Sequence, residues 1–119
     1  MECEIAKIYE ATERTARKPY QCRECGGQIA KGERYLNCSG LWDWGYETHK
    51  QHLVCADACM LIRDKIENEC IPFGYLMEWY GEHKYDLRES RLAPGVPEFR
   101  QLMAKVLNRK LQESRHAQR

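Results

Sequence analysis

The sequence predicts a small α+β domain in which a β-hairpin and a helix share one bound metal ion, with additional helices at the C-terminal end. Three observations support this class. The pair Cys22-x2-Cys25 is followed directly by two glycines, a pattern typical of two thiolates that bind one metal from a tight turn. A second pair, Cys55 and Cys59, begins a stretch without Gly or Pro. The 119 residues suffice for one domain, and no segment has the composition of a linker.

The composition predicts a folded protein without membrane contact. Hydrophobic residues make up 43% of the chain and charged residues 31%. No run approaches the roughly 18 apolar residues that a membrane span needs, and the first residues lack the pattern of a secretory signal. We therefore expect a cytoplasmic location.

The seven cysteines are better explained by metal binding than by disulfides. Their number is odd, and reducing cytosol keeps thiols free. Cys3, Cys38 and Cys70 stand apart from the two pairs, and we expect them to be ordinary buried side chains.

The second half of the metal site can be completed in two ways. Residues 56–69 are predicted to be helical, and steps of four and three place Cys55, Cys59 and two isoleucines on one face. The favoured ligand set is Cys22, Cys25, Cys55 and Cys59. His52, near the extension of the same face, is the alternative fourth ligand. Four protein ligands leave no place for a catalytic water, so we expect one structural zinc ion.

The segment "GGQIAKGERY" predicts the hairpin that carries the first cysteine pair. It is typical of a turn, a short strand, a second turn at Gly32 and a strand that begins near Tyr35. With a helix that supplies the second pair, this arrangement is a treble-clef-like finger. We place this zinc-finger core at about residues 14–70 and a helical C-terminal extension at about residues 72–115, within a single domain 1–119.

The strings "ARKPYQCRECGGQIAKGERY" and "SGLWDWGYETHK", followed by the second cysteine pair and "IRDKI", resemble a family of small, largely uncharacterised phage and prophage zinc-finger proteins. The likeness covers about residues 14–76. It implies the same fold and a setting in the cytoplasm of a bacterial host, and it implies no activity. The chain departs from the family in one respect: the second pair is Cys55-x3-Cys59 where the family has Cys-x2-Cys, which leaves the fourth ligand open.

Outside the core, the sequence predicts strands before the helices. Residues 3–13 fit a strand, with a short helix as the alternative, and residues 34–54 fit two aromatic-rich strands joined by a loop from Ser39 to Gly45. A short second helix is expected at about residues 75–83.

A last helix is expected after Pro97. Its apolar residues recur at helical spacing and predict a stripe that packs on the domain or meets a partner or a second copy: Phe99, Leu102, Met103, Val106, Leu107 and Leu111. Arg109 and Lys110 are expected on the outer face of this helix.

We expect a non-enzymatic binding module, with a protein partner from host or phage favoured. The candidate contact residues alternate along one segment: Trp42, Trp44 and Tyr46. The alternative is nucleic-acid binding through two basic segments that flank an acidic middle: Arg14, Arg17, Lys18 and Arg23, with Arg109 and Lys110. A treble-clef nuclease is the least favoured class, because "SGLWDW" carries no histidine that could act as a general base.

Overall fold

The computed structural model describes residues 8–67 and 71–117. Cys3, Cys70 and the first residues of the expected N-terminal strand lie outside this part of the chain. Within it, the protein is a small α+β structure. The elements in chain order are β1 (Ile8–Thr15), β2 (Tyr20–Gln21), β3 (Gln28–Ile29), β4 (Arg34–Trp42), β5 (Gly45–His52), α1 (Leu53–Leu61), a π-helical continuation η1 (Ile62–Ile66), α2 (Leu76–Glu89) and α3 (Val96–Ala117).

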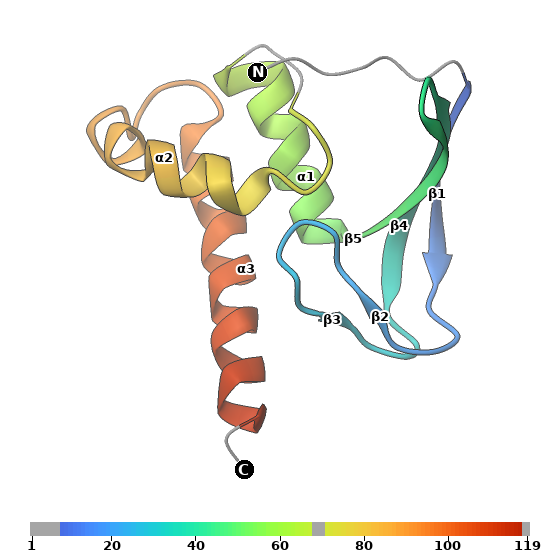
Figure 1. Cartoon of the computed structure of the whole chain (residues 1–119). Coiled ribbons are helices and arrows are strands. Elements are labelled where there is room, and N and C mark those ends of the chain that lie inside the picture. Colours follow the sequence, from blue (N-terminus) through green and yellow to red (C-terminus); the bar gives the residue numbers. More distant parts are fainter. Residues whose placement is uncertain (1–7, 68–70, 118–119) are drawn as a thin grey trace.

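The larger sheet is antiparallel, in the order β1-β4-β5, and the short strands β2 and β3 pair in a separate hairpin. Figure 1 shows the larger sheet on one side of the molecule, the helices on the other, and the β2–β3 hairpin between them. This hairpin, with the turn it encloses at residues 22–27, is called the knuckle below. The strand expected near the N-terminus is present as β1.

The two long strands β4 and β5 are joined by a shorter connection than the sequence suggested. Pairing continues from Ser39↔Thr48 to Trp42↔Gly45, so the expected loop from Ser39 to Gly45 shrinks to two residues between the strands. Gly45 has φ 130°, a conformation that residues with side chains rarely adopt, and it lets the chain reverse at once. The tight turn presents the aromatic residues at the end of the sheet.

Helix α1 follows β5 without an intervening loop. It begins at Leu53, earlier than the expected start near residue 56, with His52 as its N-cap residue. The helical path then widens to π geometry over η1, where the amide of Glu67 donates to the carbonyl of Ile62 at 2.8 Å.

The hydrophobic core lies where α1, α2 and α3 meet the knuckle. Its fully buried side chains include large apolar residues of η1, α2 and α3: Ile62, Leu76, Trp79, Phe99, Met103 and Val106. Trp79 and Phe99 meet edge to face with ring centroids 5.4 Å apart, an arrangement that aromatic pairs favour.

The predicted apolar stripe of α3 is only partly buried. Phe99, Met103 and Val106 lie in the core, whereas the side chains of Leu107 and Leu111 are 37% and 52% exposed. The domain covers only the first part of the stripe, because the C-terminal half of α3 extends beyond α1, as Figure 1 shows, and turns a polar face to the knuckle.

Arg109 and Lys110 lie on that polar face, so the prediction that they point outward is wrong. Arg109 bonds to the carbonyl of Gln28 and to the carboxylate of Glu33, and Lys110 donates to the carbonyl of Cys25 at 2.8 Å. The neighbouring Glu113 accepts from the amide of Gln28 at 3.0 Å. The side chains of α3 therefore satisfy backbone groups of the knuckle.

Candidate metal centre

The structure brings together four buried side chains that can hold a metal ion: Cys22, Cys25, His52 and Cys55. One potential ligand atom from each lies within 4.8 Å of all the others. Cys22 and Cys25 come from the knuckle, His52 is the last residue of β5, and Cys55 lies in the first turn of α1. Sequence-distant elements thus converge on one point.

The separations suit a tetrahedral zinc site. The Nδ1 atom of His52 lies 3.3 Å from the Sγ atom of Cys25 and 3.8 Å from that of Cys55. Bonds of about 2.3 Å to sulfur and about 2.05 Å to nitrogen at tetrahedral angles would place such atoms roughly 3.6 Å apart. The two observed distances lie on either side of this value, so the position of His52 relative to these two thiols suits a shared ion.

The ring of His52 is oriented by the knuckle itself. Its Nε2 atom lies 2.9 Å from the carbonyl oxygen of Gln28, an acceptor, so this nitrogen carries the proton. The lone pair of a neutral ring is then on Nδ1, the atom that faces the thiols. In metal sites, a hydrogen bond from the ring nitrogen that does not bind the metal commonly fixes the orientation of the histidine.

Backbone amides also point at the sulfur atoms. The amide of His52 donates to Cys22 Sγ at 3.3 Å, and the amide of Gly27 donates to Cys25 Sγ at 3.4 Å. Gly26, at φ 75°, makes the turn that directs the amide of Gly27 to the sulfur atom of Cys25. Such donors favour the charged thiolate, the form that binds metals.

The side chains of the cluster also shift one another's pKa values. Hydrogen bonds from Cys25 and Cys55 lower the pKa of Cys22 far below that of a free thiol, while a hydrogen bond to Cys22 raises the pKa of Cys55 far above it. Burial alone would lower the pKa of His52, but hydrogen bonds to Cys22 and Cys25 raise it to about 10. Three thiols this close cannot all ionise together unless a positive charge joins them.

Cys59 lies outside this group of ligand atoms. It is half-buried one turn further along α1, and burial, together with the carboxylate of Glu24, raises the pKa of its thiol. Because α1 begins at Leu53, Cys55 already occupies its first turn and Cys59 faces the helical core. A signal for the observed group was present in the sequence: His52-x2-Cys55 has the same spacing as Cys22-x2-Cys25.

Sequence reasoning missed Glu24, the residue between the knuckle cysteines. Its side chain is buried and accepts from the amides of Gly74 at 2.7 Å and Leu76 at 3.1 Å, and from Gln51 Nε2 at 2.9 Å. A buried carboxylate with three donors is well satisfied. It joins the knuckle to the N-terminus of α2.

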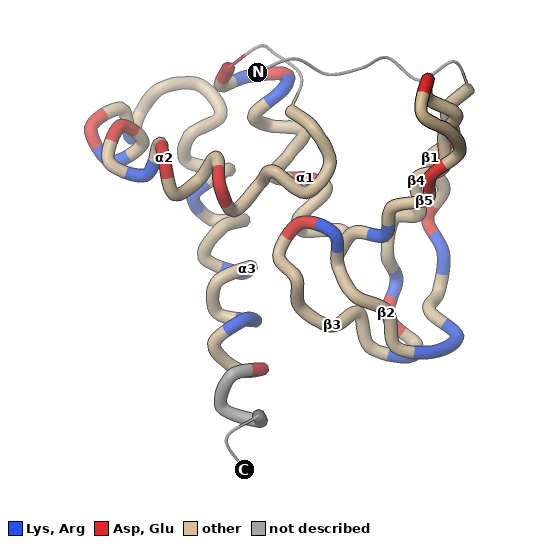
Figure 2. Tube along the Cα trace, in the orientation of Figure 1, with Lys and Arg blue, Asp and Glu red and all other residues tan. Residues whose placement is uncertain are grey.

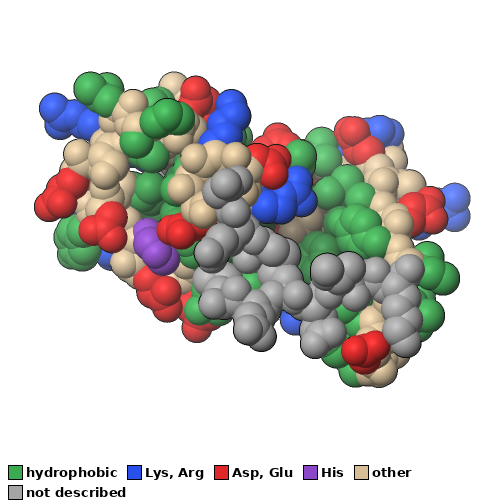
Figure 3. All heavy atoms as spheres, turned by 90° about the horizontal axis from the view of Figure 1, so that it is seen from above, with side chains coloured by type: hydrophobic (Ala, Val, Ile, Leu, Met, Phe, Trp, Pro, Cys, Tyr) green, Lys and Arg blue, Asp and Glu red, His purple; other side chains and the backbone are tan. Residues whose placement is uncertain are grey.

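The aromatic candidates for partner binding are not equivalent. Trp42 is 7% exposed and packs at right angles to Phe73, whereas Trp44 and Tyr46 are 58% and 68% exposed. Trp44 stacks on Trp42 with centroids 6.0 Å apart. Seen from above, hydrophobic side chains are exposed over both the sheet side and the helix side of the molecule (Figure 3).

The basic candidates separate into two groups. Exposed side chains surround the knuckle and the lower end of the sheet: Arg14, Arg17, Lys18 and Arg23. Figure 2 shows Lys and Arg concentrated in this region and acidic residues near the opposite end of the sheet. Arg109 and Lys110 do not belong to that surface, because they bind the knuckle.

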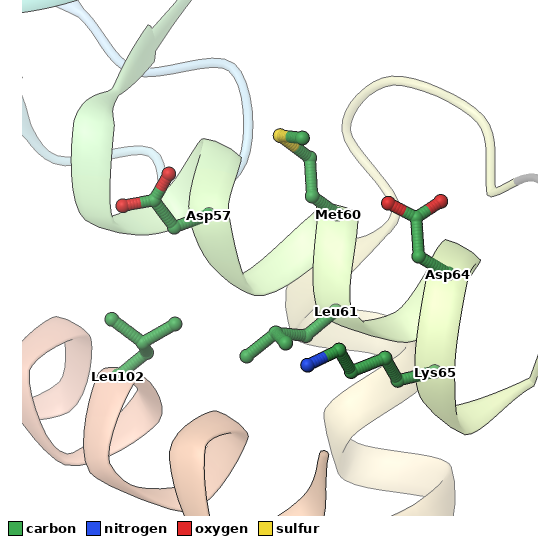
Figure 4. Close-up of a pocket in the computed structure, with 6 residues that line it drawn as sticks. All are labelled: Asp57, Met60, Leu61, Asp64, Lys65 and Leu102. Atoms are coloured by element: carbon green, nitrogen blue, oxygen red, sulfur yellow. The ribbon is translucent and has the colours of Figure 1, made fainter.

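One pocket lies apart from the metal cluster and another borders it at Cys22. One, of about 320 Å³, is bounded by α1, η1 and α3. Figure 4 shows Leu61 and Lys65 pointing toward Leu102 across it, with two aspartates of the same helical segment at its border. The other, of about 500 Å³, lies beside the knuckle and is lined by Arg23, Lys50, Glu47 and neighbouring residues.

In comparisons with protein-family models, curated proteins and solved structures, nothing matches the chain. The resemblance to phage and prophage zinc-finger proteins therefore stays a prediction. Among the described residues, no helix combines the length and the hydropathy that crossing a membrane requires.

Proposed function

We propose that the chain is a non-enzymatic, treble-clef-like zinc-finger module that docks onto a protein partner. One structural zinc ion is held by Cys22, Cys25, His52 and Cys55. The observation that carries the proposal is the convergence of these four buried ligand atoms within 4.8 Å.

The chemistry of the cluster favours zinc in a structural role. Three thiolates and one imidazole form a common ligand set for zinc, and four protein ligands fill its tetrahedral shell. A closed shell leaves no position for water or substrate, so the ion serves folding. Binding at such a site contributes on the order of 10 kcal/mol, comparable to the net stability of a small domain.

The end of the sheet at the β4–β5 turn is the proposed docking surface. Trp44 and Tyr46 expose large aromatic side chains there, and Ile8 on the adjacent strand β1 is 67% exposed. Aromatic residues of this kind are frequent anchors of protein interfaces. We therefore expect a partner surface with an apolar pocket that receives these side chains. The phage resemblance points to a host or phage protein.

The docking proposal is tested by affinity capture with matched variants. Trp44→Ala is expected to lose a protein that the wild-type chain retains, because it removes an exposed anchor worth on the order of 2 kcal/mol or more. Tyr85→Ala is the control, since Tyr85 on α2 is 66% exposed and distant from the turn. Unchanged metal content and circular dichroism would show that both variants fold. Equal capture by all three proteins would contradict the proposal.

Nucleic-acid binding is the second candidate, favoured by the exposed basic residues around the knuckle. Its surface is smaller than the sequence suggested, because Arg109 and Lys110 are occupied. A mobility-shift assay with single- and double-stranded DNA at two salt concentrations separates the two functions. A strong, salt-sensitive shift that Arg17→Ala and Lys18→Ala weaken would replace protein docking by nucleic-acid binding.

A further inference from the structure

Strand β1 has one open edge. It pairs with β4 along its whole length, and its other side has no strand neighbour among the described residues. Its side chains are almost all exposed. By contrast, the outer edge of β5 is partly covered, because the amide of Arg23 donates to the carbonyl of Lys50 at 2.7 Å. An open edge of this length is a template for another strand.

The hydrogen bonds of Ala16, directly after β1, show which residues of the strand point their N–H and C=O groups toward β4 and which point them to the open edge. Ala16 donates to the carbonyl of Glu33 and accepts from the amide of Gly32, both at 2.8 Å, so its backbone groups face β4. The register with β4 is continuous from Ile8 to Thr15. Backbone groups alternate in an antiparallel ladder, so the odd-numbered residues of β1 direct theirs to the open edge.

This alternation limits how two copies of β1 can pair antiparallel about a twofold axis. Outward-facing residues must face each other, so the axis passes through a residue and not between two. With the axis at Thr12, Ala11 of each copy pairs with Glu13 of the other, and Tyr9 pairs with Thr15. Each of these pairs exchanges two backbone hydrogen bonds.

The charges of β1 select this register among the allowed ones. With the axis at Thr12, Glu10 of each copy faces Arg14 of the other, in a non-hydrogen-bonded pair where side chains approach most closely. An axis at Glu13 would oppose two identical carboxylates, and an axis at Ala11 would leave Glu10 opposite Thr12. Only the axis at Thr12 gives two pairs of oppositely charged side chains.

Both charges are available for this pairing. Glu10 is exposed and has no ion-pair partner in the part of the chain that the structure describes, and Arg14 bonds only to its neighbour Thr12, at 3.2 Å. The third charged residue, Glu13, already pairs with Arg34 at 3.3 Å, on the other face of the sheet.

We propose that two copies of this chain join through their β1 edges, with the twofold axis at Thr12, to form one continuous six-stranded sheet. Glu10 and Arg14 of opposite copies pair on one face of that sheet. The interface is separate from the metal centre, and it meets the proposed docking surface only at Ile8.

The test uses sedimentation equilibrium of the zinc-loaded full chain at low salt concentration. The wild type is expected to dimerise. Glu10→Arg and Arg14→Glu should each weaken dimerisation roughly tenfold or more, because each turns both unlike pairs into like pairs. Glu82→Arg on α2 is the control for a charge reversal at an exposed site and should have no effect.

The decisive sample is an equal mixture of the two single variants. In a mixed dimer, Arg at position 10 of one copy faces Glu at position 14 of the other, and the native Arg14 and Glu10 face each other, so dimerisation should return. A wild type that stays monomeric at every concentration would overturn the proposal. A mixture that dimerises no better than its two components would also overturn it. If only Leu107→Glu weakened dimerisation, the contact would lie on α3 instead.

Discussion

At the scale of the residue, the decisive feature is the position of His52 relative to Cys59. The thiol pattern predicted three of the four clustered side chains, because the spacing of Cys22 and Cys25 and the position of Cys55 before a helix are local properties. The fourth depends on where α1 begins. A start at Leu53 puts His52 at the knuckle and turns Cys59 into the core, and helix starts are the least certain feature of a sequence pattern.

Substitutions at these two positions are expected to differ sharply. His52→Ala should lower zinc affinity by at least tenfold, since it opens the tetrahedral shell, whereas Cys59→Ser should retain one zinc ion per chain. His52→Cys is the matched rescue, because a fourth thiolate also suits zinc. Native mass spectrometry with competition by a chelator measures all three. Loss of zinc from Cys59→Ser with retention in His52→Ala would restore the ligand set that the cysteine pattern favoured.

At the scale of the element, α3 is attached to the knuckle by polar contacts. Helical periodicity predicted that α3 exists and which residues begin its buried stripe. It could not show that the stripe ends at Val106, because only the tertiary arrangement places the knuckle, rather than an apolar surface, beside Arg109. A periodic pattern records which side chains share a face, and it does not record what that face meets.

The contact between Glu33 and Arg109 makes this attachment pH-dependent. Partial burial alone would raise the pKa of Glu33, but hydrogen bonds from Arg109 and from the amide of Ala30 lower it below the usual value for Glu. A lowered pKa stabilises the fold above the carboxyl pKa of the unfolded chain, about 4.3, and this stability is lost as the pH falls through the folded value.

Glu33→Gln should therefore reduce the free energy of unfolding by about 1 kcal/mol at pH 7, and the difference from wild type should shrink at pH 4 and below. Urea unfolding with zinc in excess measures it, and taking the difference between the two proteins removes the common effect of acid on the metal ligands. A difference that is the same at both pH values would show that the carboxylate does not carry the contact.

At the scale of the whole molecule, the α+β class follows from the sequence because turn residues, cysteine spacing and helical periodicity agree with one another. The outline of the sheet was also accessible, apart from the length of the β4–β5 connection. The open edge of β1 was not, since its partner strand β4 is distant in the sequence.

Removal of the metal is expected to unfold the knuckle and α1 together. The core around the cluster contains few large apolar residues of the knuckle, so without the ion it loses the interaction that holds β2, β5 and α1 at one point. Circular dichroism during titration with a strong chelator should show loss of helix that added zinc reverses. An unchanged thermal midpoint after complete removal of zinc would contradict the structural role.

The buried carboxylate of Glu24 has a consequence for the order in which the chain assembles. Its donors at Gly74 and Leu76 lie beyond the segment that holds all four clustered ligands. A fragment cut after α1 would keep those ligands and the donor at Gln51, but the Glu24 side chain would lose its two backbone donors. During synthesis, the knuckle can thus gather its cysteines early, yet it reaches its final packing only after α2 has emerged and docked.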